Sequence, residues 1–457
     1  MLVQTLKFWE VGVQVPFSKA AADTLRNSFV NLLIRDKLVT AEQAAECIRS
    51  GDNVVLSMGC AEPIPLVEAL VNRKQDLRGV TVHQMLPIYE AAYMKPGIER
   101  HFRHVSWFSS SMTRPGVKAG RAAVVPGYLY EYPRFFEESL DTDVFMGTVS
   151  QVDRHGFASL GISVNYTLPA AKKADRVILV VNPRMPRTHG NTHIHVSQAD
   201  LLVLDDRPLP EVKFDPPSEE DKLIAAHISE LVENGSTLQL DIGTVAQAVV
   251  GALWDKKDLG IHTEFVTDAV VDLVETGIVT NRRKLLHPGK IVCTSAMGTS
   301  RLYEFLDDNP MIEMRPVSYT NDPYVVSRNA NMVAINSASE VDLLGQCSAG
   351  GIGPGKYVGT SGQIDFARGV SMSSGGKFFM ALRSRDEKGR SAIVPQLRQG
   401  TVVNIGFNDV DYVVTEFGIA KLRGKTVRER AEALISIAHP QFADGLREAA
   451  KKIGLTR

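Results

Sequence analysis

The sequence has few cysteines and no long apolar run. The four cysteines, Cys47, Cys60, Cys293 and Cys347, are far apart and form no CxxC pair. Neither a zinc site nor a disulfide framework is therefore predicted, and a reducing cytosol is the expected compartment. Nowhere do about 18 apolar residues run together, so we expect no membrane-spanning helix. The first thirty residues contain Glu10 and Asp23 and lack a long apolar stretch, so we expect no secretory signal.

Charge of one sign is not in excess either. The chain has 51 basic and 52 acidic residues, which gives a formal net charge of −1. A chain balanced in this way has no general attraction for nucleic acid or for an anionic membrane, so neither is expected as a partner. Its 457 residues are too many for one ordinary core. Two or three domains of about 100–200 residues are expected.

Short apolar runs recur along the chain, and helical patterns separate several of them. In the first half the strand-like runs are 53–57, 80–82, 122–125, 143–146 and 176–181. In the second half they are 237–241, 290–294, 332–336, 377–382, 401–405 and 412–415. Runs of this kind between helices are typical of open, mainly parallel sheets with both faces covered. The predicted fold class is therefore α/β.

The chain has two similar halves. The segment 205–220 is rich in proline and charge and is typical of a linker. The opening pattern of helix, strand and glycine turn returns after it, because Gly51, Leu56 and Gly59 recur 184 positions later as Gly235, Leu240 and Gly243. We predict two tandem, similar, open-sheet α/β domains. The predicted boundaries are 1–30 for an N-terminal extension, 31–210 for the first domain, 211–220 for the linker and 221–457 for the second domain.

Two strand-to-helix turns and one glycine-dense run could bind a ligand. The turns are those at Gly59 and Gly243, although a simple turn is the commoner explanation for either glycine alone. The run 345–376 holds ten of the chain's 36 glycines, together with aromatic residues that argue against a disordered linker. It contains neither GxxxxGK[ST] nor a GxGxxG that opens a βαβ unit. Its unshielded backbone amides suit an elongated anion.

One carboxylate, Glu264, stands at an expected helix start. Thr263 is a good N-cap residue, and apolar residues follow at helical spacing until Gly277. The helix field would favour the ionised carboxylate. Taken alone, Glu264 is more often a surface charge that complements the helix end. The histidines His189, His193 and His195 lack acidic or cysteine partners at ligand spacing. We predict hydrogen-bonding roles for them and no metal site.

Several motifs together resemble the acetyl-CoA hydrolase/transferase family. They are Gly-Ile-His-Thr-Glu at 260–264, Glu-Val-Asp-Leu at 340–343 with Gly-Gln at 345–346, Ser-Gly-Gln-Ile-Asp-Phe at 361–366 with Arg-Gly at 368–369, Val-Thr-Glu-Phe-Gly-Ile-Ala at 414–420 with Leu-Arg-Gly at 422–424, and Ala-His-Pro at 438–440. In the first half they are Asp-Arg-His-Gly at 153–156, Ser-Leu-Gly at 159–161, and Asn182 with Met-Pro-Arg-Thr at 185–188. The resemblance runs from about residue 35 to the C-terminus and implies a CoA-transferase-like fold.

The resemblance also implies a chemistry. The glutamate of the His-Thr-Glu motif, here Glu264, is the nucleophile, and a glutamyl-CoA thioester forms during ping-pong transfer from an acyl-CoA to a carboxylate. CoA enters as a thioester substrate, and no permanently bound cofactor is expected. The positions that correspond to CoA contacts in the family are Asp241, Ile242, Gly243, Thr244, Val245, Ser339 and Gly362. For the oxyanion of the tetrahedral intermediates, our candidate donors lie in the loop Gly59, Cys60 and Ala61.

The chain departs from the family pattern at Asp241, Ala246 and Ser339. Relatives more often read Gly-Ile-Gly-x-Ile-Pro in the first loop and carry an apolar residue at the position of Ser339. The acceptor could therefore be butyrate, 4-hydroxybutyrate, acetate or a dicarboxylate such as itaconate or succinate. Acyl-CoA hydrolysis uses the same groups with water as acceptor, and a non-catalytic ligand sensor of related fold is a further alternative. We expect a cytoplasmic homo-oligomer with small-molecule partners.

Overall fold

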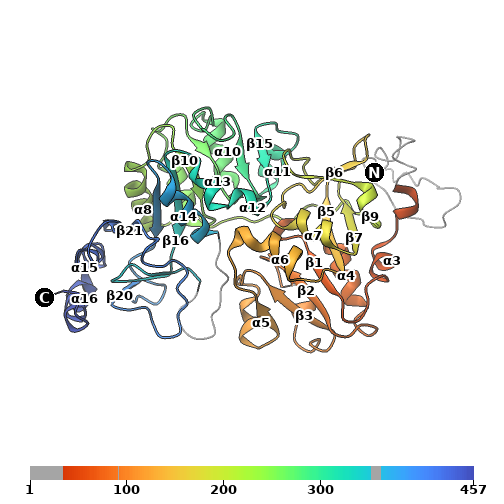
Figure 1. Cartoon of the computed structure of the whole chain (residues 1–457), viewed down its shortest axis with the longest axis horizontal. Coiled ribbons are helices and arrows are strands. Elements are labelled where there is room, and N and C mark those ends of the chain that lie inside the picture. The colour runs from red at the N-terminus through yellow and green to blue at the C-terminus, as the bar shows by residue number, and fades with distance from the viewer. Residues whose placement is uncertain (1–33, 91, 351–361, 457) are drawn as a thin grey trace. The chain divides into compact units, whose positions relative to one another are not determined.

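A computed structural model describes residues 34–90, 92–350 and 362–456 (Figure 1). The predicted extension 1–30 and part of the glycine-dense run, 351–361, lie outside the described residues. The chain forms two compact units. Of the described residues, the first unit comprises those in 34–125, 131–212 and 294–317, and the second comprises those in 126–130, 213–293 and 318–456. Two segments, 126–130 and 294–317, belong to the unit formed mainly by the other half of the chain. The predicted domain boundaries stay a prediction.

The first unit is built on a parallel sheet of seven strands in the order β4-β3-β2-β1-β5-β7-β9. The strands are β1 (Asn53–Leu56), β2 (Val80–Gln84), β3 (Phe102–Ser106), β4 (Ala122–Val124), β5 (Val144–Val149), β7 (Arg176–Val181) and β9 (Leu201–Leu204), with a separate pair β6 (Phe157–Ser159) and β8 (His193–His195). The helices are α3 (Ala41–Ala45), α4 (Ile64–Asn72), α5 (Arg114–Lys118), α6 (Tyr132–Glu138), α7 (Thr167–Lys173) and α11 (Ser300–Leu306).

The second unit has a six-stranded sheet in the order β11-β10-β16-β19-β21-β22, in which only the edge pair β21–β22 is antiparallel. The strands are β10 (Thr237–Leu240), β11 (Gly260–Ile261), β16 (Met332–Ser337), β19 (Lys377–Ala381), β21 (Tyr412–Thr415) and β22 (Gly418–Lys421), with a small sheet of β17 (Glu340–Asp342), β18 (Cys347–Ser348) and β20 (Ile393–Val394). The helices are α8 (Glu219–Glu230), α9 (Thr244–Gly251), α10 (Asp268–Glu275), α12 (Val317–Thr320), α13 (Pro323–Ser327), α14 (Gln363–Met372), α15 (Val427–Ser436) and α16 (Pro440–Lys452).

Helices cover both faces of this second sheet (Figure 1). Ala334 of β16 and Phe378 of β19 belong to the buried cluster that includes α14 and α15. Their neighbours Ile335 and Phe379 point to the other face, because side chains alternate along a strand. Helices α8 and α9 contact that sheet at β21 and β16. Coverage of both faces explains why the strands appear in the sequence as continuous apolar runs and not as alternating ones.

The two sheets confirm the predicted α/β fold class and the internal similarity. Gly51 and Gly235 precede the strands β1 and β10 with φ angles of +89° and +82°. Gly59 and Gly243 follow those strands with φ angles of +61° and +132°. Each glycine therefore holds a backbone conformation that other residues rarely adopt, and the repeated spacing reflects repeated turns.

Two sequence expectations need correction. The run 401–405 contains no strand; Ile405 forms only an isolated bridge with Cys347. The glycine-dense run 345–376, for which no helix was predicted, contains the helix α14. Gly369 stands inside this helix because a Cβ there would lie 2.5 Å from Val326 of α13, so glycine permits the close approach of the two helices. None of the helices in the described residues combines the length and the apolar character needed to cross a bilayer.

Candidate active site

Glu264 does not lie in a helix, as the sequence suggested, but at a bend that follows β11. The short strand β12 (Phe265–Val266) comes directly after Glu264. Helix α10 begins only after the N-cap residue Thr267. His262 donates its backbone N–H to Leu238 at 3.0 Å, and Thr263 donates to Val292 at 2.9 Å. These bonds to residues distant in sequence hold the backbone before Glu264 outside a helix, although the local apolar spacing is helical.

The residues before Glu264 fix its backbone. A Cβ at Gly260 would lie 2.5 Å from Cγ of Lys284, so glycine leaves room for that side chain. The fully buried His262 ring lies 2.8 Å from the carbonyl oxygen of Thr320. Burial lowers the pKa of His262 to about 3, so the ring is neutral and its Nε2–H donates to Thr320. The Thr263 hydroxyl donates to the carbonyl of Leu240 at 3.1 Å, at the end of β10.

The carboxylate of Glu264 is buried, with 9% of the residue exposed. Its Oε2 accepts a hydrogen bond from Nδ2 of Asn321 at 3.2 Å, and the backbone N–H of Gly362 also donates to the carboxylate. Burial, together with the charge of Asp241, raises the pKa of Glu264 to about 8, while the two hydrogen bonds act in the opposite direction. The sequence placed Glu264 in the first turn of a helix whose field would keep the carboxylate ionised. That expectation is wrong, because α10 begins after Glu264. The backbone N–H that does reach the carboxylate comes from Gly362, which is the N-cap of a different helix, α14.

Gly362 lies so close to Glu264 that no side chain fits between them. A Cβ at this position would lie 2.1 Å from Oε2 of Glu264 and 2.2 Å from Nδ2 of Asn321. Asn321, which sequence reasoning missed, is fully buried between α12 and α13. Its only sequence signal is the Asn-Asp-Pro turn before α13, which carries no chemistry. Glu264, Asn321 and Gly362 thus meet although they are far apart in the chain.

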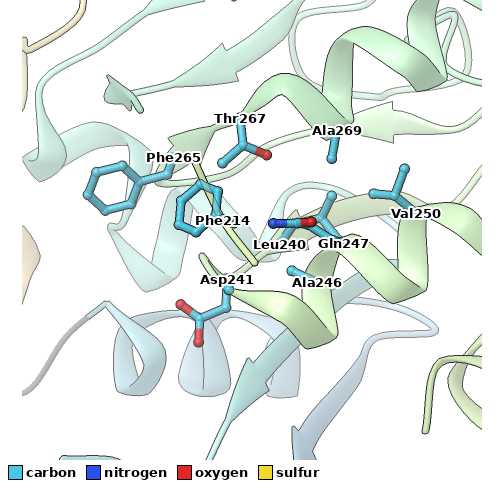
Figure 2. A pocket seen from close by; sticks show the side chains of 10 residues that line it. Phe214, Leu240, Asp241, Ala246, Gln247, Val250, Phe265, Thr267 and Ala269 are labelled. Carbon is cyan, nitrogen blue, oxygen red and sulfur yellow. The ribbon is translucent and has the colours of Figure 1, made fainter. Parts of the chain in front are cut away.

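The loop at 241–245 also lies close to the nucleophile candidate. Residues Asp241, Ile242 and Gly243 follow β10, and Thr244 and Val245 begin α9. A pocket joins this loop to Phe265, the residue after Glu264 (Figure 2). Its lining residues are Phe214, Leu240, Asp241, Gly243, Ala246, Gln247, Val250, Phe265, Thr267 and Ala269. Ser339, by contrast, is exposed beyond the end of β16 and bonds through its backbone N–H to Ser348 at 2.7 Å.

The remaining candidates lie in the first unit. Gly59, Cys60 and Ala61 form a buried 3-10 turn after β1, and Ser57 fixes the turn by donating its hydroxyl to Ala61 at 2.6 Å. Burial raises the pKa of the Cys60 thiol to about 11, so it is not a thiolate at neutral pH. The oxyanion role of this loop stays a prediction. Ring nitrogen Nδ1 of His195 lies 2.7 Å from the Ser197 hydroxyl. In the described part of the chain no group of three or more His, Cys, Asp or Glu residues could hold a metal ion.

Comparison with known proteins identifies the family of the chain. The acetyl-CoA hydrolase/transferase N-terminal domain matches residues 34–213, and the acetyl-CoA hydrolase/transferase C-terminal domain matches residues 298–450. The chain is 46% identical to succinyl-CoA:cyclohexane-1-carboxylate CoA transferase of Geobacter metallireducens, over 92% of this chain and 96% of that protein. It is 45% identical to 4-hydroxybutyrate coenzyme A transferase of Clostridium kluyveri, over 92% of this chain and 98% of that protein.

A solved structure shares the whole architecture. RipA from Yersinia pestis is 36% identical to the chain and superposes with a TM-score of 0.90, covering 93% of this chain and 99% of that one. These matches confirm the family and the enzyme class, CoA transfer, that the sequence predicted. The chain therefore belongs to the acetyl-CoA hydrolase/transferase family.

Proposed function

We propose that the enzyme moves CoA from an acyl-CoA to a free short-chain carboxylate by a ping-pong reaction in which Glu264 is the nucleophile. The observation that carries the proposal is the buried Glu264 carboxylate, held by the amide of Asn321 and the backbone N–H of Gly362. A buried carboxylate with directed donors is costly to the fold, so it is typical of a functional group.

In the proposed reaction the Glu264 carboxylate attacks the thioester carbonyl. The carbon–sulfur bond breaks, which leaves a mixed acyl–glutamyl anhydride and free CoA thiolate. The thiolate then attacks the glutamyl carbonyl, the carbon–oxygen bond to the acyl group breaks, and the first carboxylate leaves. The acceptor carboxylate runs the same steps in reverse. Asn321 and Gly362 orient the attacking oxygen, and a dry site protects the anhydride from water.

Two similar transferases suggest the acceptor class. Their names give cyclohexane-1-carboxylate and 4-hydroxybutyrate as the acids handled. We propose a monocarboxylate or dicarboxylate of comparable size for this enzyme. Acetate, butyrate, 4-hydroxybutyrate, succinate, itaconate and cyclohexane-1-carboxylate, each tested against one labelled acyl-CoA, would identify the acceptor by its kcat/KM.

The covalent intermediate provides the direct test. Wild-type enzyme incubated with acetyl-CoA and no acceptor should gain the mass of CoA less one water, because Glu264 retains CoA as a thioester. Intact-protein mass spectrometry measures the gain. The variant Glu264→Ala should show none. An absent adduct on wild type, combined with full turnover by Glu264→Ala, would contradict the mechanism.

The rate of adduct formation should rise with pH. Only the ionised carboxylate attacks, and the pKa of Glu264 is about 8, so about one tenth of the enzyme is reactive at pH 7. The rate should increase nearly tenfold per pH unit below 7 and level off above pH 8–9. Quenched-flow mass measurements between pH 6 and 9.5 give the profile, with Glu264→Ala correcting for spontaneous thioester loss. A rate independent of pH across this range would exclude a titrating nucleophile.

A further inference from the structure

Asp241 ties together three chain segments next to Glu264. Its Oδ1 accepts the backbone N–H of Ile242 at 2.9 Å, at the end of β10. Its Oδ2 accepts the backbone N–H of Ser337 at 3.2 Å, at the end of β16, and Nε2 of Gln363 at 3.4 Å, in the first turn of α14. All three donors come from elements that end or begin at the same edge of the second sheet.

Gln363 links Asp241 to the part of α14 that contacts Glu264. Its Nε2 also donates to the carbonyl of Ser337 at 3.1 Å, and the residue is buried. Gln363 directly follows Gly362, whose backbone N–H donates to the Glu264 carboxylate. The position of that N–H therefore depends on how firmly the first turn of α14 is held.

We propose that Asp241 is a positioning residue for the reaction at Glu264, because it anchors the first turn of α14 so that Gly362 stays directed at the nucleophile. The inference rests on the proposed function of Glu264. It assigns Asp241 a role other than a contact with CoA. Figure 2 shows its carboxylate directed toward the helix below the pocket, away from the side chains of Phe214 and Gln247.

The charge of Asp241 also affects the pKa of Glu264, which can be measured separately from the reaction rate. Among the described residues, Asp241 is the charged group that acts on Glu264, and it raises the pKa of that carboxyl. Burial raises the pKa of Asp241 itself, against the hydrogen bonds from Ile242, Ser337 and Gln363. Removal of its charge should therefore lower the pKa of Glu264, because a like charge near a carboxylate disfavours ionisation.

The test compares Asp241→Asn, Gln363→Met and wild type by the rate of adduct formation with acetyl-CoA between pH 6 and 9.5. Asp241→Asn replaces an acceptor with an amide donor and removes the charge. We expect its plateau rate to fall about tenfold and its pH midpoint to move down by about 0.5–1 unit. Gln363→Met removes the hydrogen bond between Asp241 and α14 but keeps the charge of Asp241. Its plateau rate should therefore fall, while its pH midpoint should move by less than about half of the shift expected for Asp241→Asn. Asp255→Asn, after α9 and half exposed, is the matched control and should behave as wild type.

The outcomes separate the inference from the proposed function. Wild type that forms the adduct, with Asp241→Asn and Gln363→Met indistinguishable from Asp255→Asn, would overturn the inference and leave Glu264 as nucleophile. Wild type that forms no adduct would overturn the proposed function and the inference together. Circular dichroism and thermal unfolding verify that each variant folds. If Asp241→Asn does not fold, the plateau of Gln363→Met decides.

Discussion

The variant Glu264→Gln should lose CoA-transferase turnover by a factor on the order of 10⁴ or more, because an amide cannot form the anhydride. The measurement is kcat/KM with acetyl-CoA and an acceptor carboxylate, together with the absence of the CoA adduct. Glu264→Ala is the second variant, since slow hydrolysis of an introduced glutamine would restore activity. Retention of more than about one hundredth of wild-type kcat/KM by Glu264→Ala would contradict the nucleophile assignment.

The same glutamine variant should be more stable than wild type at neutral and higher pH. The folded-state pKa of Glu264 is raised from 4.5 to about 8, so the protonated carboxyl contributes stability that is complete below about pH 4.5. That contribution falls as pH rises and is lost once pH passes about 8. The difference in unfolding free energy between Glu264→Gln and wild type should be near zero at pH 4.5 and on the order of 3 kcal/mol at pH 7.

Urea unfolding of both proteins at pH 5, 7 and 8.5 measures this difference, because the pH dependence of all other groups cancels between the two. We expect Glu264→Gln to lose turnover and to gain unfolding free energy relative to wild type at neutral pH. A difference that does not change with pH would mean that Glu264 titrates normally in the folded state.

Gly362→Ala should lower kcat about 100-fold while the fold persists. The added Cβ would lie 2.1 Å from Oε2 of Glu264 and 2.2 Å from Nδ2 of Asn321, so one or both side chains must move. Both are side-chain ends, so the structure can relax. The relaxation displaces the nucleophile and its donor by a distance on the order of 1 Å, which is enough to cost that factor.

Two glycines serve as controls for this substitution. Gly251→Ala in α9 adds a methyl group with nothing within 4 Å and should leave kcat unchanged. Gly369→Ala in α14 brings a Cβ within 2.5 Å of Val326, so it should reduce the melting temperature without a selective loss of kcat at a temperature where the variant is folded. If Gly362→Ala behaves as either control, the close approach of Gly362 to Glu264 has no catalytic role.

Local pattern predicted much of the fold. The strands β1, β2, β5, β7, β10, β16, β19 and β21 all lie on apolar runs recognisable in the sequence. The strand β3 was missed because its middle residues, Arg103 and His104, interrupt the apolar pattern. The helix α14 was missed because it has glycines at its N-cap, 362, and inside it, at 369, and glycine has a low helical propensity. The helix forms nevertheless, because packing against α13 overrides that propensity.

The sequence alone determined the α/β class, the two similar halves, the family and Glu264 as the residue to examine. Each of these depends on residues near one another in the chain, where spacing and motif are visible. Only the tertiary structure decided the surroundings of Glu264: a bend after β11 in place of its own helix start, the buried amide of Asn321, and the N-cap Gly362 of a helix that comes much later. The physical reason is that burial and long-range hydrogen bonds set the pKa and orientation of a carboxylate, and neither can be obtained from local spacing.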